Sequence, residues 1–287
     1  MPNPSATTHL QCLQVWGGTE AADQTLAMTG LDGYLYAKPH QNAKRGGDVY
    51  YLSSCASGRI TRVMLADVAG HGSKVSETAQ DLRSLMQQYV NFTSQKRFMQ
   101  ALNQKFAEVT EDGRFATTVA MSFFAPAKKL SLSNAGHPAP MWYRASERRW
   151  EVLGIDPEDL ADDVSADLPF GIYEDAGYQQ TDITFMPGDM LLMYTDALIE
   201  SRAEDGKQVG IRGLVNRLNR LGTREPDAVI PALLQQLETD DANDLTDDDV
   251  TALLIASNGT KFEWLKILAS PFNAIRGVIK GVPVGPG

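Results

Sequence analysis

Residues 60–72 read Ile-Thr-Arg-Val-Met-Leu-Ala-Asp-Val-Ala-Gly-His-Gly, and this stretch decides how the chain folds. Its first seven residues are mostly β-branched or apolar, which predicts a strand. Asp67 stands where that strand ends, and the glycines after it allow a sharp turn. Upstream, Val49–Ser53 predicts a second strand after the turn Gly46-Gly-Asp48. Ser57-Gly58 lies between the two strands and predicts a hairpin.

Two predicted helices follow this hairpin, and further predicted strands come after them. Apolar residues recur at helical spacing from Val75 to Tyr89 and from Phe98 to Val109, which predicts two amphipathic helices. Strands joined by hairpin turns on both sides of a helical pair argue against alternating βαβ units. The pattern predicts an α+β fold of two sheets with helices outside. The other predicted strands are Leu35–Ala37, Phe115–Phe124, Leu130–Leu132, Met141–Tyr143, Ile183–Phe185, Met190–Tyr194 and Val250–Ala256, and the other helices are 210–220 and 226–238.

The acidic balance of the chain excludes a primary nucleic-acid binder. The 287 residues carry 26 Lys and Arg against 36 Asp and Glu, a formal charge of −10, whereas binding to a nucleic-acid backbone needs an excess of Lys and Arg. Residues 151–200 hold 13 acids and no base. The N-terminus lacks the basic start and apolar run of a secretion signal, and no apolar run approaches the roughly 18 residues of a spanning helix. We therefore expect a soluble, cytoplasmic protein.

Four aspartates stand where predicted strands begin or end, namely Asp48, Asp67, Asp196 and Asp248. Carboxylates that converge repel one another and do not all stay ionised without a cation. Mg²⁺ and Mn²⁺ prefer oxygen ligands, and two such ions about 4 Å apart can share a water and clamp a phosphoryl group. Taken singly, each aspartate is more readily explained as a turn residue, a cap or a solvated side chain.

The order of the motifs is more specific than any one of them. The motifs are Gly46-Gly-Asp48, Asp67-Val-Ala-Gly-His-Gly72, Phe115-Ala-Thr117, Asn134-Ala-Gly-His-Pro138, Leu168-Pro-Phe-Gly171, Pro187-Gly-Asp189, Tyr194-Thr-Asp196 and Asp248-Asp-Val-Thr251. In this order, the chain resembles the bacterial PP2C-type protein serine/threonine phosphatases of the SpoIIE and RsbU group. It departs from that family at Ala197, where the family often has glycine, and at His71, where the family commonly has lysine.

The resemblance implies an αββα sandwich with a dinuclear centre of Mn²⁺ or Mg²⁺. In the family's pattern, Asp48 and Asp67 orient the water that bridges the two ions, and this water attacks phosphoserine or phosphothreonine. Asp249 is a candidate ligand for a third, weaker metal. The implied ligands of the two main ions are Asp48, Asp67, the backbone carbonyl of Val68, Asp196 and Asp248.

Several residues around the motifs have two possible roles. Lys44 and Arg45 precede the Gly-Gly-Asp turn, and they either contact a phosphate or belong to a solvated turn. His71 either relays a proton to the leaving serine oxygen or shapes its loop, and we favour the second role. His137 lies in a turn rich in Pro and Gly, which favours a structural role. The acidic loop 154–180 either selects a partner with a basic face or is a flexible connection.

The motifs place the phosphatase domain at residues 1–257, with residues 1–30 as a leading arm of small and polar residues. Residues 258–287 are expected to form a C-terminal tail. Its apolar residues from Phe262 to Ile279 approximate a helical stripe that Pro271 interrupts. Packing on the domain or in a homodimer is favoured for this tail over contact with a membrane surface.

Two classes of function remain in competition. The first is a metal-dependent protein serine/threonine phosphatase. The resemblance implies a phosphorylated STAS-type, anti-anti-sigma protein as its substrate in partner switching, with control by a separate sensor or regulatory protein or by the tail. The second is a catalytically inactive pseudophosphatase that binds a partner as a regulatory module. The presence of all four ligand aspartates argues against the second class. A zinc hydrolase is disfavoured because the histidines are not clustered.

Overall fold

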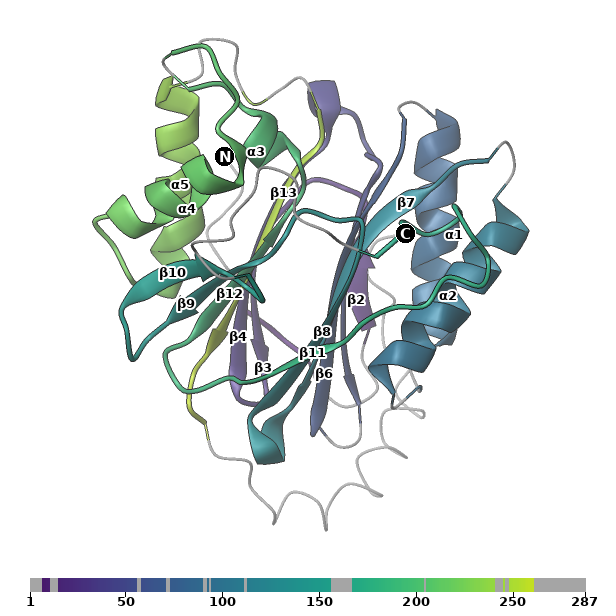
Figure 1. The fold of residues 1–287 in the computed structure, drawn as a ribbon, viewed down its shortest axis with the longest axis horizontal. Coiled ribbons are helices and arrows are strands. Elements are labelled where there is room, and N and C mark those ends of the chain that lie inside the picture. Colours follow the sequence, from purple (N-terminus) through teal and green to yellow (C-terminus); the bar gives the residue numbers. More distant parts are fainter. Residues whose placement is uncertain are drawn as a thin grey trace.

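Two β-sheets face one another, and helices cover both outer faces, in the computed structural model of the chain (Figure 1). The layers therefore run helix, sheet, sheet, helix, and the predicted α+β fold with an αββα arrangement is confirmed. The residues that the structure describes are 7–10, 15–55, 58–70, 73–89, 92, 94–110, 113–155, 167–203, 205–240, 245 and 248–260.

The first sheet has seven strands in the order β1-β3-β4-β13-β12-β9-β10. All neighbours in it pair antiparallel except β1 and β3, which are parallel. β13 lies at its centre and is buried along its whole length, as expected for a strand covered on both faces. The strands are β1 Thr8–His9, β3 Ala22–Met28, β4 Leu31–Lys38, β9 Met141–Arg144, β10 Arg149–Val152, β12 Met190–Tyr194 and β13 Val250–Ser257.

The second sheet has six strands in the order β11-β8-β7-β6-β5-β2, and every pair is antiparallel. The predicted hairpin joins β5 to β6, and their register sets Asp48 directly opposite Asp67. The strands are β2 Val15–Gly18, β5 Asp48–Cys55, β6 Ile60–Val68, β7 Ala116–Phe124, β8 Lys129–Ala135 and β11 Thr181–Thr184.

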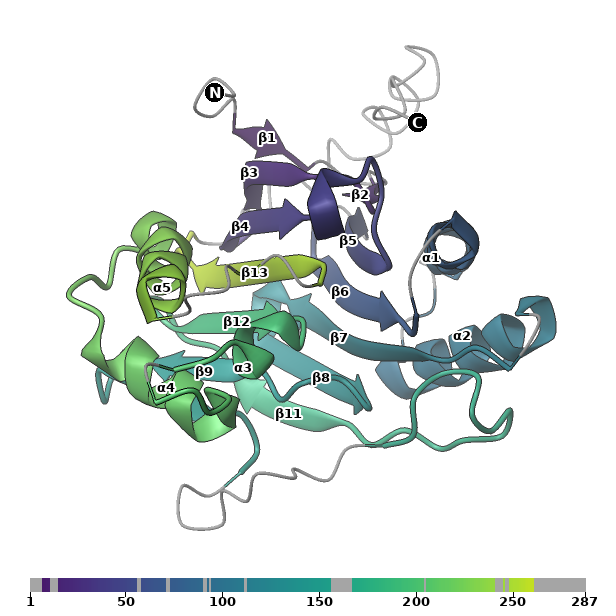
Figure 2. The same ribbon diagram turned by 90° about the horizontal axis from the view of Figure 1, so that it is seen from above.

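Two helix pairs cover the outer faces of the sheets (Figure 2). The helices α1 (Ser73–Gln88) and α2 (Gln95–Val109) pack on the six-stranded sheet, and α4 (Gly210–Arg220) and α5 (Pro226–Asp240) pack on the seven-stranded sheet. Ser94 caps α2, and its side chain accepts a bond from the backbone N–H of Arg97 at 3.4 Å. Two short 3₁₀ turns, His40–Asn42 and Ala125–Ala127, and a short helix α3 (Ala197–Glu200) complete the described elements.

The core consists of three apolar layers, because each sheet buries both of its faces. In β13, Leu253 and Ile255 face the layer between the sheets, whereas Ala252 and Leu254 face the layer under α4 and α5. A strand that alternates between two apolar layers reads as a continuous apolar run. Strand ends are therefore the places where polar side chains can meet.

The prediction of a leading arm over residues 1–30 is wrong for the described part of that segment. β3 pairs with β4 over its whole length, and β2 pairs with β5, so both strands belong to the sheets. β3 buries Leu26 and Met28 and exposes Asp23 and Gln24 near its beginning. The exposed polar residues gave the segment its arm-like composition. Strand β10 and helix α3 were not predicted either.

Other predictions fall partly on residues that the structure does not describe. His71, residues 156–166 of the acidic loop and residues 261–287 of the tail lie outside the described residues. Within the described part of the chain, no helix is long and apolar enough to cross a membrane.

Candidate active site

The β5–β6 hairpin brings two of the predicted ligands together at one end of the six-stranded sheet. Asp48 begins β5, Asp67 lies near the end of β6, and the two residues are cross-strand partners. The turn before β5 comes close to the next residue of β6, because the N–H of Val68 donates to the carbonyl of Gly47 at 3.3 Å. A Cβ on Gly47 would lie 3.0 Å from the Val68 carbonyl oxygen. The absence of a side chain at Gly47 therefore eases this close approach.

Asp48 connects the two sheets through its carboxylate. Its Oδ2 accepts a bond from the hydroxyl of Thr251 in β13 at 2.6 Å and a second bond from the hydroxyl of Thr195 after β12 at 3.0 Å. The N–H of Thr251 also donates to the Thr195 hydroxyl oxygen at 3.0 Å. Both hydroxyl bonds fall on Oδ2, so neither engages Oδ1. The side chain is 5% exposed. The pair of threonines therefore holds a buried carboxylate in one orientation.

The other two predicted ligand aspartates come from the neighbouring ends of β12 and β13. Asp196 follows β12 at the start of α3, and Asp248 precedes β13. The two strands pair antiparallel, with Tyr194 opposite Ala252, so the end of one lies beside the start of the other. The hydroxyl bonds to Asp48 join this corner of the seven-stranded sheet to the β5–β6 end.

Asp48, Asp67, Asp196 and Asp248 are crowded carboxylates, and we call their surroundings the aspartate corner. Burial, and then the neighbouring Asp67, raise the pKa of Asp48 well above its usual range. Burial, and then Asp196 and Asp248, raise the pKa of Asp67 to about 7. Burial, and then Glu200 and Asp248, raise the pKa of Asp196 to about 6. Each of these groups is thus hard to ionise while its neighbours are charged.

The donor set fits hard divalent cations. Every predicted ligand atom is an oxygen, which suits Mg²⁺ and Mn²⁺. Positive charge would also relieve the mutual repulsion that raises these pKa values. Among the described residues, no three His, Cys, Asp or Glu side chains already converge on one point as a cation-binding group. The chemistry of the predicted ligands thus suits a divalent cation.

Asp249, the candidate third-metal ligand, accepts hydrogen bonds from the backbone around the Gly-Gly-Asp turn. Its Oδ2 accepts a bond from the N–H of Gly47 at 2.5 Å, and its Oδ1 accepts one from the N–H of His40 at 2.6 Å. A Cβ on Gly46 would collide with this carboxylate. Asp249 therefore fixes the Gly-Gly-Asp turn, and binding of a third metal stays a prediction.

The predicted phosphate contacts lie beside this turn. The Arg45 Nε forms an ion pair with Glu20 at 3.0 Å, and its Nη1 donates to Gln80 of α1 at 3.2 Å. Lys44 is exposed. The contact of Lys44 and Arg45 with a phosphate stays a prediction.

His137 has the contacts of a structural residue. It is buried, and its Nδ1 lies 2.9 Å from the hydroxyl oxygen of Thr117. The side chain of Asn134 accepts a bond from the N–H of His137 and donates one to its carbonyl, both at 2.8 Å. Burial lowers the pKa of the ring to about 3, so the ring is neutral.

The threonine pair is the part of the site that sequence reasoning missed. Thr195 and Thr251 both stand inside quoted motifs, directly before Asp196 and three residues after Asp248. A threonine close to the predicted ligand in each of two motifs was the available signal. Their common target, Asp48, is distant in sequence and is set only by the packing of the two sheets.

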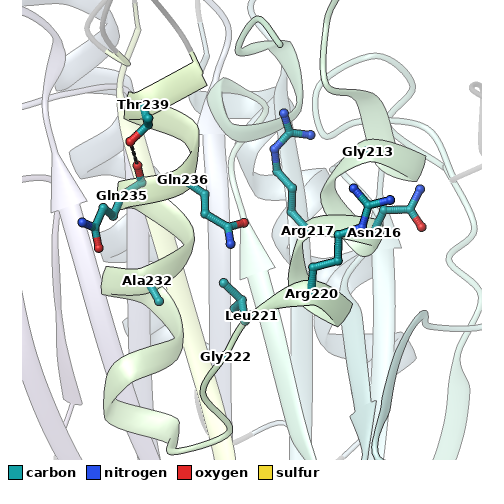
Figure 3. Close-up of a pocket in the computed structure, with 10 residues that line it drawn as sticks. All are labelled: Gly213, Asn216, Arg217, Arg220, Leu221, Gly222, Ala232, Gln235, Gln236 and Thr239. Atoms are coloured by element: carbon teal, nitrogen blue, oxygen red, sulfur yellow. Dashed lines mark hydrogen bonds between the residues drawn. The ribbon is translucent and has the colours of Figure 1, made fainter. Parts of the chain in front are cut away.

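A groove elsewhere on the molecule is separate from this corner. It lies between α4 and α5 and has a volume of about 620 Å³ (Figure 3). Arg217, Arg220 and Gln236 are among the side chains that line it, and none of the predicted site residues does. The candidate site therefore belongs to the strand ends and not to this groove.

Comparison with known proteins agrees with the geometry. The family model of Stage II sporulation protein E (SpoIIE) matches residues 57–258. The phosphoserine phosphatase RsbP of Bacillus subtilis (strain 168) is 22% identical over 178 residues, which cover 60% of this chain and 40% of RsbP. The chain therefore spans less than half the length of this relative.

Two solved structures share the fold. The PP2C phosphatase domain of SpoIIE from Bacillus subtilis, solved with a fragment of its regulatory domain, has a TM-score of 0.63 at 15% identity, covering 86% of this chain and 64% of that one. RsbX in complex with magnesium has a TM-score of 0.59 at 14% identity, covering 82% of this chain and 99% of that one. Together with the family match over most of its length, these findings show that the chain belongs to the SpoIIE family of PP2C-type protein serine/threonine phosphatases.

Proposed function

We propose that this chain is a metal-dependent phosphatase that releases phosphate from phosphoserine or phosphothreonine in a protein. The observation that carries the proposal is the meeting of four strand ends, where the buried Asp48 and the half-buried Asp67 and Asp196 lie close together and have raised pKa values. Family membership and the similarity to a phosphoserine phosphatase support the reaction class.

The ligands of the proposed centre are Asp48, Asp67, the backbone carbonyl of Val68, Asp196 and Asp248, and they would hold two divalent cations, Mn²⁺ or Mg²⁺. When bound, these cations supply the Lewis acidity that activates water and neutralises phosphoryl charge. The magnesium in the RsbX structure supports a divalent ion.

The remaining residues of the site orient these ligands. Thr195 and Thr251 fix Oδ2 of Asp48, which leaves its other oxygen in a defined direction. Asp249 holds the N–H of Gly47, and Gly47 in turn lies against Val68. Such outer contacts commonly set the affinity of a metal centre.

The proposed substrate is a phosphorylated STAS-type protein of a partner-switching system, and the proposed control comes from a separate sensor or regulatory protein. The resemblance to the SpoIIE and RsbU group supports both. Both proposals presuppose phosphoester hydrolysis, which a small phosphoester tests without the partner proteins.

Hydrolysis of p-nitrophenyl phosphate in Mn²⁺, in Mg²⁺ and in excess chelator tests the reaction class. We expect hydrolysis with one or both ions, loss of it in chelator, and loss of about 1,000-fold in Asp196→Asn, since a barrier increase of ~4 kcal/mol corresponds to that factor. Circular dichroism checks that the variant is folded. Hydrolysis that survives both chelator and Asp196→Asn would refute the proposal. Absence of both Mn²⁺ binding and hydrolysis would favour the pseudophosphatase alternative.

A further inference from the structure

Thr117 lies beside Asp67 on the neighbouring strand β7. The strands β6 and β7 pair antiparallel, and their register sets Thr117 directly opposite Asp67, just as β5 sets Asp48 opposite Asp67 on the other side. Side chains that are directly opposed in an antiparallel pair lie on the same face, with Cβ atoms about 4.5–5.5 Å apart. Asp48, Asp67 and Thr117 therefore form one row across three strands, and Thr117 borders the aspartate corner.

The hydroxyl of Thr117 is held by His137. Its oxygen lies 2.9 Å from Nδ1 of the His137 ring, and this side chain is buried. The side chain of Asn134 fixes the backbone of His137 through bonds to both its N–H and its carbonyl. Further along the same loop, the carbonyl of Ala139 accepts a bond from the Tyr194 hydroxyl at 2.9 Å, which ties the loop to β12. The ring that contacts Thr117 is therefore fixed in place.

The Thr117 hydroxyl can contact a second polar group while it contacts His137. A threonine hydroxyl has one proton and two lone pairs, so one bond to a ring nitrogen does not exhaust it. No hydrogen bond joins the Thr117 and Asp67 side chains within the described part of the chain, and it is the strand register that makes Asp67 the neighbouring polar group. Asp48 shows the same type of contact, because its Oδ2 accepts hydroxyl bonds from two threonines.

We propose that Thr117 is a positioning residue for Asp67, and that His137 acts on Asp67 through Thr117. This inference rests on the proposed phosphatase function, because Asp67 is one of the ligands of the proposed metal centre. The Asp67 side chain is only half-buried, so a fixed hydroxyl beside it limits the directions in which its oxygens point. A ligand that is already oriented loses less conformational freedom when a cation binds, and the affinity rises.

Isothermal titration with Mn²⁺ tests Thr117 with two substitutions. Thr117→Val keeps the shape of the side chain and removes the hydroxyl. We expect it to weaken Mn²⁺ binding by about tenfold, as for other outer contacts of metal centres. Thr117→Ser keeps the hydroxyl and should bind Mn²⁺ nearly as tightly as the wild type.

The matched control is Thr118→Val on the same strand. Thr118 is the next residue of β7, so its side chain lies on the opposite face of the sheet. It is fully buried, and its hydroxyl oxygen has no hydrogen-bond partner among the described residues. The control therefore removes a buried threonine hydroxyl without touching the aspartate corner, and it should keep the wild-type affinity for Mn²⁺.

A double-mutant cycle tests the part played by His137. His137→Phe keeps a ring in the buried place and removes the nitrogen that contacts Thr117. We expect it to weaken Mn²⁺ binding in the wild-type background and to have no further effect in Thr117→Val, because both substitutions break the same contact. If circular dichroism shows that His137→Phe does not fold, His137→Leu takes its place in the cycle.

Three results would overturn the inference. They are equal Mn²⁺ affinities of Thr117→Val and Thr118→Val, equal losses in Thr117→Ser and Thr117→Val, and independent effects of the His137 and Thr117 substitutions. In each case the wild type still binds Mn²⁺, and the proposed function is unaffected. If the wild type neither binds Mn²⁺ nor hydrolyses p-nitrophenyl phosphate, the proposed function itself fails, and no metal centre is left for Thr117 to serve.

Discussion

Asp48 and Asp189 have the same local sequence and the same burial but opposite surroundings. Each follows a glycine at the beginning of a strand, and each is 5% exposed. Both oxygens of Asp189 accept backbone N–H bonds at 2.9 Å, from Ala145 and from Met186. Asp48 has two hydroxyl bonds on one oxygen and faces the carboxylate of Asp67. The first arrangement stabilises a turn, and the second concentrates negative charge.

The difference shows that burial alone does not separate a structural aspartate from a proposed cation ligand. The separating feature is what the carboxylate oxygens contact. Backbone N–H groups compensate a buried charge without any ion. A neighbouring carboxylate makes the buried charge less favourable, and a cation bound as proposed would offset that cost. Substitutions of Asp48, of Asp189 and of the threonines that bond Asp48 test this difference.

The largest difference is expected in catalysis. We expect Asp48→Asn to lower metal-dependent phosphate release by about 1,000-fold, which corresponds to ~4 kcal/mol of barrier, because a proposed ligand is lost. Asp189→Asn should stay within about threefold of the wild type, since its carboxylate only closes a turn. Initial rates on p-nitrophenyl phosphate in Mn²⁺ measure both. Equal losses in the two variants would remove the distinction between the residues.

Stabilisation by Mn²⁺ should separate the two aspartates next. At a free concentration of about 100 times Kd, the wild type should gain about 2.7 kcal/mol, or roughly 5–10 °C in Tm. Asp189→Asn should gain as much, and Asp48→Asn should gain little. Thermal unfolding with Mn²⁺ and with excess chelator measures the shift. A full shift in Asp48→Asn would show that this residue is not a ligand.

In chelator, we expect Asp189→Asn to be less stable than Asp48→Asn, the opposite of the order expected in Mn²⁺. Asp189→Asn replaces one acceptor by an amide NH₂ that faces a backbone N–H, so we expect a loss of about 1–3 kcal/mol in the free energy of unfolding. Asp48→Asn removes a buried charge beside Asp67 and should leave the metal-free protein as stable as the wild type, or more stable. Urea denaturation at pH 7 compares them, and greater destabilisation by Asp48→Asn than by Asp189→Asn would contradict the repulsion argument.

The smallest effect is expected at the threonine pair. Thr251→Val and Thr195→Val each remove one hydroxyl bond to Asp48, and we expect each to weaken Mn²⁺ binding by about tenfold, as for other outer contacts of metal centres. Thr181→Val on the exposed β11 is the matched control. Isothermal titration with Mn²⁺ gives the affinities. If both threonine variants match the control, the hydroxyls do not orient the ligand.

Most elements could be predicted from local pattern, and the exceptions have physical reasons. β6 and β12 are apolar runs that end at aspartates, so both the strands and their ends could be predicted. β3 escaped prediction because it begins with exposed polar residues and buries only Leu26 and Met28. β10 has only four residues, of which two are buried, so its alternating pattern is too short to distinguish it from a turn.

The sequence by itself determined the family, the layer order and the set of candidate ligands, because motif order and apolar periodicity are local properties of the chain. Only the tertiary structure decided how the aspartates differ from one another. Asp48, Asp189 and Asp249 look alike in sequence, yet one meets hydroxyls and a carboxylate while the other two meet backbone N–H groups. The partners of Asp48 and Asp249 are up to 209 residues away in the chain, and only strand pairing and the packing of the two sheets bring them together.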